Sequence, residues 1–182
     1  MNENDNNANA LSALPANHAL EIPAFGKSPV LRLEMASIRR AESRLIEAKD
    51  VNPSTYADLE HDYNEAYREL KRHISSIGYQ LAMANKALEE AKADVILGSY
   101  AEHLQGKPKY QDNSNMRDAF ITRDPVYTAA YERVAQLKAL ESNFDGKIKV
   151  LENVCRYMRK KMDLILRSGM DANVYNTQGR RS

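Results

Sequence analysis

The sequence has little of what β-rich or disulfide-linked folds require. It has no Trp, one Cys, seven Gly and six Pro among its 182 residues. The single thiol excludes an intramolecular disulfide, and the shortage of turn-forming residues argues against a sandwich or a barrel. The formal net charge is only +1. Any affinity for nucleic acid must therefore come from local clusters of charge.

Two further absences concern the location of the protein. No apolar run approaches the roughly 20 residues that a membrane-spanning helix needs. The start of the sequence also lacks the charged-then-apolar pattern of a secretory signal. We therefore expect a cytoplasmic protein that has no membrane partner.

No set of residues with the pattern of a catalytic or metal site stands out. His61 and Glu65 are four residues apart on an expected helix, with Asp58 one turn earlier, but no second histidine is near them. Cys155 has apolar neighbours, which is typical of a buried small residue. No glycine-rich loop matches a phosphate-binding loop. We therefore predict no catalytic residues, no metal site and no cofactor.

The two ends of the chain lack helical periodicity. Residues 1–29 are rich in Asn and Pro, which predicts a disordered or mobile tail. Apolar side chains then recur at helical spacing and predict a first helix at about 30–49. Pro53 interrupts this pattern, because the residue before a proline resists the α conformation. Gly169 is expected to end the last helix and to leave 169–182 as a loose C-terminal tail.

Two much longer amphipathic stretches follow the first helix. One is expected at 54–104, and the other begins at Asp124 and Pro125 and ends near residue 168. Apolar or small residues recur in both at spacings of three and four. A helix of about 50 residues is about 75 Å long. A globular core does not need that length, whereas a coiled coil or an elongated bundle does.

A short connection joins the two long stretches. It contains "SNMRDAFI", which predicts a short helix with Ser114 as its N-cap. Long helices joined in this way fold back as an antiparallel hairpin. We predict an all-α fold, in which residues 30–168 form an elongated antiparallel long-helix hairpin, coiled-coil-like, with a first packing helix and a short helix in the connection. Apolar surface left open on such a hairpin favours self-association.

Charge is segregated within this neutral chain. Segment 147–167 has seven cationic and two acidic residues, whereas segment 54–105 has nine acidic and five cationic ones. The connection at 106–123 has four cationic and two acidic residues. Basic clusters beside aromatic side chains suit a phosphate backbone and stacked bases. A solvated helix face is the alternative, since cations near a helix C-terminus also complement the helix dipole.

The second half of the chain carries a resemblance. A long amphipathic helix ends in "DVILGSYAEHLQGK", and a polar connection follows with the short segment "NMRDAFIT". The closing helix then reads "RDPVYTAAYERVAQLKALESNFDGKIKVLENVCRYMRKKM". This order of segments, within about residues 30–168, resembles the phage recombination-mediator family (UvsY-like). The Asn-rich N-terminal tail has no counterpart in that family.

The resemblance implies a non-enzymatic protein that forms a ring-like homo-oligomer. It would bind single-stranded DNA, help a recombinase replace single-strand-binding protein, and work in the host cytoplasm if it is encoded by a phage. In the family, basic residues around the short middle segment contact DNA and the C-terminal helix makes oligomer contacts. The candidates carried onto this chain are Lys107, Lys109, Arg117 and Arg123 for DNA, Tyr110 and Phe120 for base stacking, and Met158, Met162 and Ile165 for oligomer contacts.

The charge cluster near the C-terminus adds further candidates. Arg156, Arg159, Lys160 and Lys161 lie within a few residues of one another and are also expected to contact DNA. A structural or scaffold coiled-coil protein is the alternative function. Its basic residues would lie at a protein interface, and it would not bind DNA.

Overall fold

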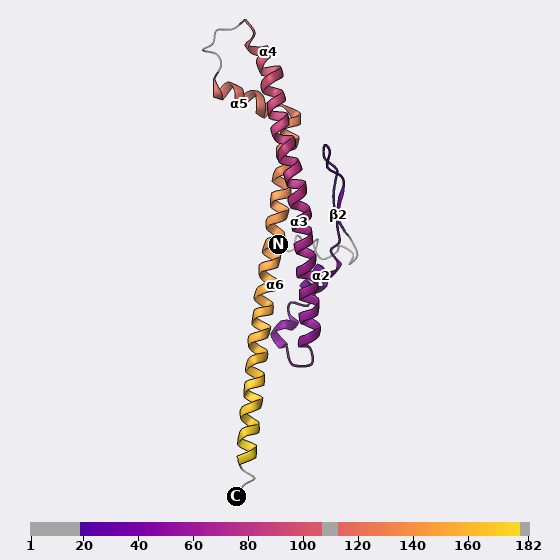
Figure 1. Ribbon diagram of the computed structural model, residues 1–182, viewed down its shortest axis with the longest axis vertical. Coiled ribbons are helices and arrows are strands. Elements are labelled where there is room, and N and C mark those ends of the chain that lie inside the picture. Colours follow the sequence, from indigo (N-terminus) through magenta and orange to yellow (C-terminus); the bar gives the residue numbers. More distant parts are fainter. Residues whose placement is uncertain (1–18, 107–112, 179–182) are drawn as a thin grey trace, which may run out of the picture. The chain divides into compact units, whose positions relative to one another are not determined.

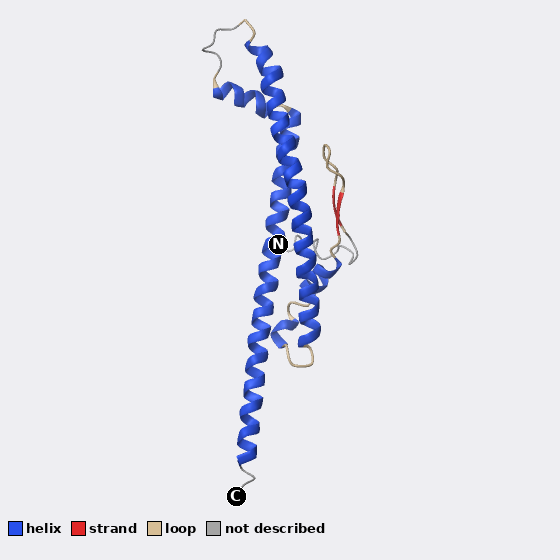
Figure 2. Ribbon diagram, viewed as in Figure 1, coloured by secondary structure: helices blue, strands red, loops and turns tan. Residues whose placement is uncertain are grey.

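The computed structural model describes residues 19–106 and 113–178, with side chains as far as Ser168, and most of this part is helical (Figures 1 and 2). The label η2 denotes a 3-10 helix and the label η3 denotes a π-helix. The elements in chain order are β1 (Leu20–Ile22), β2 (Leu31–Leu33), α2 (Ala36–Ser43), η2 (Glu47–Asp50), α3 (Tyr56–Val95), η3 (Ile96–Tyr100), α4 (Ala101–Leu104), α5 (Ser114–Arg123) and α6 (Pro125–Gln178).

The contacts between residues divide the chain into two compact units. Unit 1 contains Arg32–Arg72 and the part of α6 from Asp145 onwards. Unit 2 contains Glu21–Leu31 and His73–Phe144. Each long helix thus contributes one stretch to each unit, and each unit has its own core.

Both units are built on antiparallel pairing of α3 with α6, which confirms the predicted long-helix hairpin and the all-α class (Figure 1). In unit 1 the first turns of α3 pack with the later turns of α6, and Tyr63 and Met158 are fully buried. In unit 2 the later turns of α3 pack with the first turns of α6, and Ile77 and Phe144 are buried. Each such side chain stabilises the fold by about 1.5–3 kcal/mol.

The buried face of α3 in unit 2 includes two polar residues. His73 and Gln80 are 5% and 3% exposed, whereas Ile74 and Leu81, which belong to the apolar repeat of this helix, are only half-buried. The ring of His73 lies 5.8 Å from that of Phe144. Gln80 donates from Nε2 to the carbonyl oxygen of Pro29 at 3.2 Å. His73 and Gln80 are therefore buried because of these contacts, and the repeat of apolar residues does not predict their burial.

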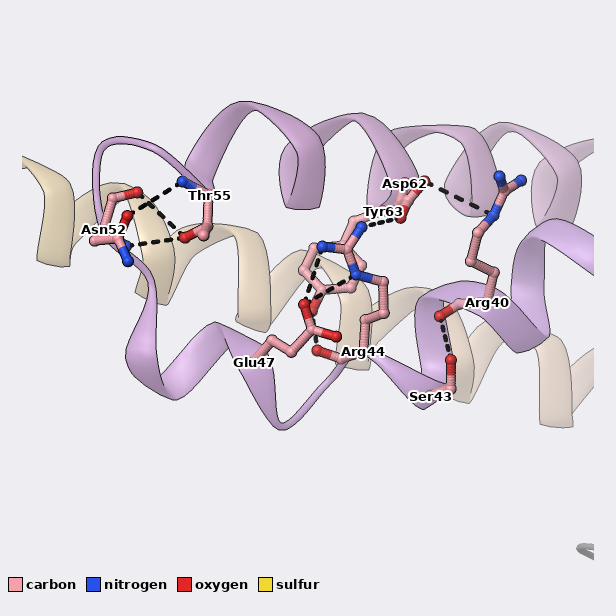
Figure 3. Close-up of polar contacts among 8 residues, drawn as sticks. All are labelled: Arg40, Ser43, Arg44, Glu47, Asn52, Thr55, Asp62 and Tyr63. Carbon is pink, nitrogen blue, oxygen red and sulfur yellow. Dashed lines mark hydrogen bonds and ion pairs between the residues drawn. The ribbon is translucent and has the colours of Figure 1, made fainter.

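A cluster of ion pairs in unit 1 holds the segment after α2 against α3 (Figure 3). Asp62, on the first turns of α3, has a side chain only 9% exposed and forms an ion pair with Arg44. Arg44 also binds Glu47, at 2.9 Å between Nη2 and Oε2. These hydrogen bonds, first to Glu47 and then to Asp62, raise the pKa of Arg44. The guanidinium therefore stays charged and joins two carboxylates from different elements.

The same segment is fixed by the hydroxyl of a buried tyrosine. Tyr63 donates from Oη to the backbone carbonyl of Arg44 at 2.8 Å (Figure 3). Burial raises the pKa of Tyr63, so the phenol stays protonated.

The turn that precedes α3 is held by the side chain of Asn52. Its Oδ1 accepts from the backbone N–H groups of Ser54 and Thr55 at 3.0 and 3.2 Å. This turn reverses the chain between η2 and α3.

The N-terminal elements differ from the prediction. The expected helix at 30–49 is divided into β2, α2 and η2, and β1 lies within the segment expected to be mobile. β1 and β2 form a two-stranded sheet, and Phe25 and Ser28 close its turn with backbone bonds of 3.1 and 2.9 Å. Gly26 lies there with φ +55°, a conformation that glycine adopts without strain. Strands of three residues are too short to produce a detectable alternation of polar and apolar residues.

The buried polar residues of unit 2 attach the turn of this sheet to the long helices. Arg133, on α6, is 5% exposed and donates from Nη2 to the carbonyl oxygen of Pro23 at 2.6 Å. Gln80, which lies on α3, donates a hydrogen bond to the carbonyl oxygen of Pro29. Burial lowers the pKa of Arg133. One hydrogen bond on each side of the turn, to Pro23 before it and to Pro29 after it, thus attaches the turn to the long helices of unit 2.

Two helix ends also correct the prediction. α6 continues through Gly169 to Gln178, because a glycine inside a helix costs only about 1 kcal/mol relative to alanine and does not end it alone. The cap of α5 is Asn113, one residue before the expected Ser114, and it accepts from the N–H of Met116 at 2.8 Å. The predicted helix to residue 104 is present, but Ile96–Tyr100 is a π-helix within it.

Candidate nucleic-acid interface

One face of α6 in unit 1 is lined by cationic side chains. Lys149, Arg156, Lys160 and Arg167 are all exposed, and their spacings of 7, 4 and 7 residues place them on one side of the helix. We call these four residues the basic stripe. At a rise of 1.5 Å per residue the stripe extends over about 27 Å. Buried Met158 lies on the opposite side of α6, so the stripe faces away from the core.

The cations of the basic stripe have no anionic partner within the described part of the chain. No ion pair joins any of the four to another described residue. Their charges are therefore available to a ligand. Lys149 and Arg167 were not among the predicted DNA contacts, although a helical projection of the sequence would have placed them beside Arg156 and Lys160.

Neighbouring cations on α6 have internal partners. Arg159 binds Glu60 on α3, at 3.1 Å between Nη2 and Oε1. This hydrogen bond raises the pKa of Arg159. Lys161 donates to the carbonyl oxygen of Lys49 in η2, and Lys147 forms an ion pair with Glu42 in α2. We call these three residues the anchored cations, and two of them, Arg159 and Lys161, had been predicted to bind DNA.

A groove lies in unit 1 between α3 and α6, next to the basic stripe. Its volume is about 590 Å³, and its lining includes Tyr63 and Tyr67 from α3 and Cys155, Arg156 and Lys160 from α6. Two members of the basic stripe thus stand at a concave surface that also carries an aromatic ring. Sequence analysis did not predict Tyr67 as part of the site, because α3 was read as an acidic helix.

Cys155 is partly buried in this groove. Burial raises the pKa of its thiol, which Arg159 only partly opposes. The thiol is therefore protonated at neutral pH, and a protonated thiol is a poor nucleophile.

The connection places other predicted residues in a different setting, within unit 2. The ring of Phe120 lies 5.4 Å from that of Tyr100 in η3 and 4.8 Å from that of His103. Arg117 lies over the ring of Tyr100, 5.7 Å from its centroid. These contacts attach α5 to η3 and α4, so Phe120 is not a free stacking surface.

The remaining predicted residues of the connection divide into two groups. Arg123, at the end of α5, is exposed. Lys107, Lys109 and Tyr110 lie outside the described residues. Among the predicted cations of the connection that the structure describes, Arg117 lies over an aromatic ring and Arg123 is exposed.

The predicted oligomer contacts are corrected in part. Met158 is fully buried within the chain and offers no surface to another copy. Met162 and Ile165 are half-buried. A second apolar row, which sequence analysis missed, lies on the exposed side of α6: Val150, Tyr157 and Leu164 are 47%, 49% and 66% exposed. Their spacing of seven residues keeps them on one side of the helix.

Residues 19–106 and 113–178 contain no group of three or more His, Cys, Asp or Glu placed to hold a metal ion. Within the same range no helix is long and apolar enough to cross a membrane. Comparison of the chain with protein-family models, with curated proteins and with solved structures gave no match.

Proposed function

We propose that this protein is a non-enzymatic recombination mediator that binds single-stranded DNA as a homo-oligomer in the cytoplasm. The basic stripe is the observation that carries this proposal. Four exposed cations, none of which has an ion-pair partner among the residues that the structure describes, follow one face of α6 for about 27 Å. The order of segments that resembles the UvsY-like family supports the choice of a single strand and of a recombinase as partner.

The stripe suits a phosphate backbone better than it suits a protein surface. Its cations lie in one row, and Lys and Arg bind successive phosphates by displacing condensed counterions. The rest of the chain compensates this charge, since the protein as a whole carries a formal charge of +1. Binding should therefore depend on this one face. An oligomer would repeat the face and increase the total affinity by multivalency.

The mediator activity requires more than affinity for DNA. A strand held along repeated stripes would be kept extended or bent, with its bases accessible to another protein. We propose that this geometry allows a recombinase to replace single-strand-binding protein. No covalent step is needed, because the free energy comes from released counterions and from the partner's own binding.

A salt titration of the whole protein tests DNA binding. The probe is a fluorescein-labelled oligothymidine of about 40 nucleotides, and the matched variant replaces Lys149, Arg156, Lys160 and Arg167 by Gln. Each phosphate contact on a single strand contributes about −0.7 to the slope of log K against log salt. Loss of four contacts should make the slope about 2.8 less negative per protomer. Equal slopes for variant and wild type would contradict the proposal.

The control removes the same charge from elsewhere. Arg32, Arg72, Lys86 and Lys92 are exposed cations on β2 and α3. A variant with all four replaced by Gln has the same net charge as the stripe variant. It should keep the wild-type slope, because none of these residues belongs to the stripe. Duplex DNA of the same length should bind more weakly than the single strand.

The exposed apolar row on α6 supports self-association. Val150, Tyr157 and Leu164 repeat every seven residues, which is the spacing of helices that pair along their length. Replacing all three by Ser should shift the native mass measured by light scattering toward the protomer. Wild-type protein that is already monomeric at micromolar concentration would contradict the homo-oligomer.

This apolar row also favours the second candidate function, a structural or scaffold coiled-coil protein. Such a protein would assemble through the row and ignore DNA. Both a mediator and a scaffold would have a high native mass. A scaffold would show no salt-dependent affinity for the labelled strand, and this result separates the two functions.

A further inference from the structure

The groove of unit 1 has a lining with two kinds of surface. Its floor includes Tyr63 and Leu151, which are 0% and 4% exposed, and the partly buried Cys155. The half-buried Tyr67 stands beside this floor on α3. A flat apolar ligand could therefore contact an aromatic ring and leave water at the same time. The volume, about 590 Å³, is within the range of small-molecule sites.

The polar part of the lining is not that of a phosphate site. It includes Asn64, Glu152 and Asp163. The two carboxylates repel a phosphate that enters the groove, but they accept hydrogen bonds from the exocyclic amino or ring N–H groups of bases. Neither carboxylate forms an ion pair with another described residue. The amide of Asn64 can both donate and accept.

The cations occupy a separate position. Arg156 and Lys160 belong both to the groove lining and to the outward-facing basic stripe. Arg159 lines the groove as well, but its charge is paired with Glu60. A strand whose phosphates follow the stripe would thus pass along the edge of the groove. Its bases would be within reach of Tyr67.

We propose that this groove is a nucleobase subsite, in which one base of the bound strand stacks on Tyr67. The inference rests on the proposed function, since it assigns a base to the groove and the phosphates to the stripe. Lys71 already lies over the Tyr67 ring, with Nζ 5.6 Å from the centroid. The base occupies the ring face away from Lys71. The subsite also accounts for a preference for single strands, because paired bases cannot leave the duplex without a cost in stacking and pairing.

The test compares strands with and without bases. The probes are the labelled oligothymidine and a phosphodiester strand of equal length whose residues are abasic. Base–aromatic stacking is worth about 1–3 kcal/mol per base, which corresponds to about 5- to 150-fold in affinity. Wild-type protein should bind the abasic strand weaker by such a factor. The Tyr67→Ala variant should lose a similar factor on oligothymidine and show little further loss on the abasic strand.

Two variants control for other effects of the substitution. Tyr67→Phe keeps the ring and should retain most of the wild-type affinity. Tyr79, on α3 in unit 2, is 62% exposed and does not line this groove, so Tyr79→Ala should bind both strands as wild type does. Circular dichroism verifies that each variant is folded. A variant that fails to fold is replaced by Tyr67→Leu, which keeps the apolar volume without an aromatic face.

The outcomes separate this inference from the proposed function. If wild type and Tyr67→Ala bind both strands equally, with the same steep dependence on salt, the subsite is wrong while DNA binding by the stripe stands. If neither strand binds to the wild-type protein, the proposed function fails as well. If Tyr67→Phe is as weak as Tyr67→Ala, the ring does not act by stacking and the inference is overturned.

Discussion

Cations from one cluster in the sequence lie on two sides of α6 in unit 1. Those on one side bind other segments of the fold, and those on the other side face solvent. The basic stripe faces outward and has no ion-pair partner within residues 19–106 and 113–168, whereas the anchored cations bind α2, η2 and α3. Arg159 and Lys160 are adjacent in the sequence, yet Arg159 is paired with Glu60 and Lys160 has no ion pair with any other described residue. Local density of charge therefore does not separate cations that stabilise the fold from cations that can bind a ligand. The angular position on the helix does.

A second region supports the same distinction. In unit 2 the predicted stacking residue Phe120 packs on Tyr100 and His103. In unit 1 the half-buried Tyr67 lies at a groove. Of these two aromatic residues, each within three residues of a cation in the sequence, Phe120 thus packs within the fold and Tyr67 is accessible at a groove.

The largest effect on stability should come from the ion-pair cluster that holds the anchored side together. Arg44→Met leaves Asp62 buried, with the guanidinium of Arg40 as its one remaining ion-pair partner among the described residues, at 3.7 Å between Nε and Oδ1. Loss of a partner in a fully buried pair costs about 3–5 kcal/mol. Because the side chain of Arg44 is 26% exposed, we expect a smaller loss, about 2 kcal/mol in the free energy of unfolding. Urea denaturation measures it.

The matched control for this substitution is Arg72→Met. Arg72 pairs with Glu69 at 2.9 Å, but its side chain is 74% exposed. Exposed pairs contribute about 0–1 kcal/mol, so the midpoint of denaturation should barely change. Equal losses for the two variants would mean that the Asp62 cluster does not hold the segment after α2.

Single substitutions on α6 sharpen the comparison between its two sides. Arg156→Gln should make the slope of log K against log salt about 0.7 less negative, with about a fivefold loss of affinity near 0.1 M salt, and should leave the melting temperature unchanged. Arg159→Gln should lower the melting temperature and change the slope less, because Glu60 already neutralises Arg159. The reverse pattern would show that the anchored side binds DNA.

The smallest effect concerns alkaline pH. Burial raises the pKa of Tyr63 above its ordinary value of about 10. Between the unfolded and the folded pKa the unfolded chain binds fewer protons than the native one, so stability falls as pH rises above about 10. Tyr63→Phe should cost about 1 kcal/mol at neutral pH and weaken this alkaline loss. Urea denaturation as a function of pH measures both effects, and an unchanged alkaline slope would exclude Tyr63 as its source.

Periodicity was sufficient for the long helices but not for the short elements. Apolar residues spaced by three and four predicted α3 and α6. The expected start of the second long helix at Asp124 is confirmed, because Asp124 caps α6 and accepts from the N–H of Tyr127 at 2.8 Å. The strands β1 and β2 were missed because three residues do not make a period. "FGKS" was the available signal, since a glycine at the first central position is typical of a tight hairpin turn.

The candidate site was predictable only in part. Arg156 and Lys160 were found from the density of charge, and Lys149 and Arg167 could have been added by projecting the helix. Tyr67 and the groove required the pairing of α3 with α6, because the two sides of the groove are more than 80 residues apart in the sequence. Which cations are anchored depended likewise on carboxylates and carbonyls of distant segments.

The order of residues is enough to predict that two long amphipathic helices form and pair, because the repeat of apolar side chains makes one face of each helix unstable in water. It also places a cluster of cations near the end of the second helix. How the segments pack then decides which of those cations have a partner among the described residues and which do not. The reason is that an ion pair depends on distances of a few ångströms between segments that the chain brings together after the helices have formed.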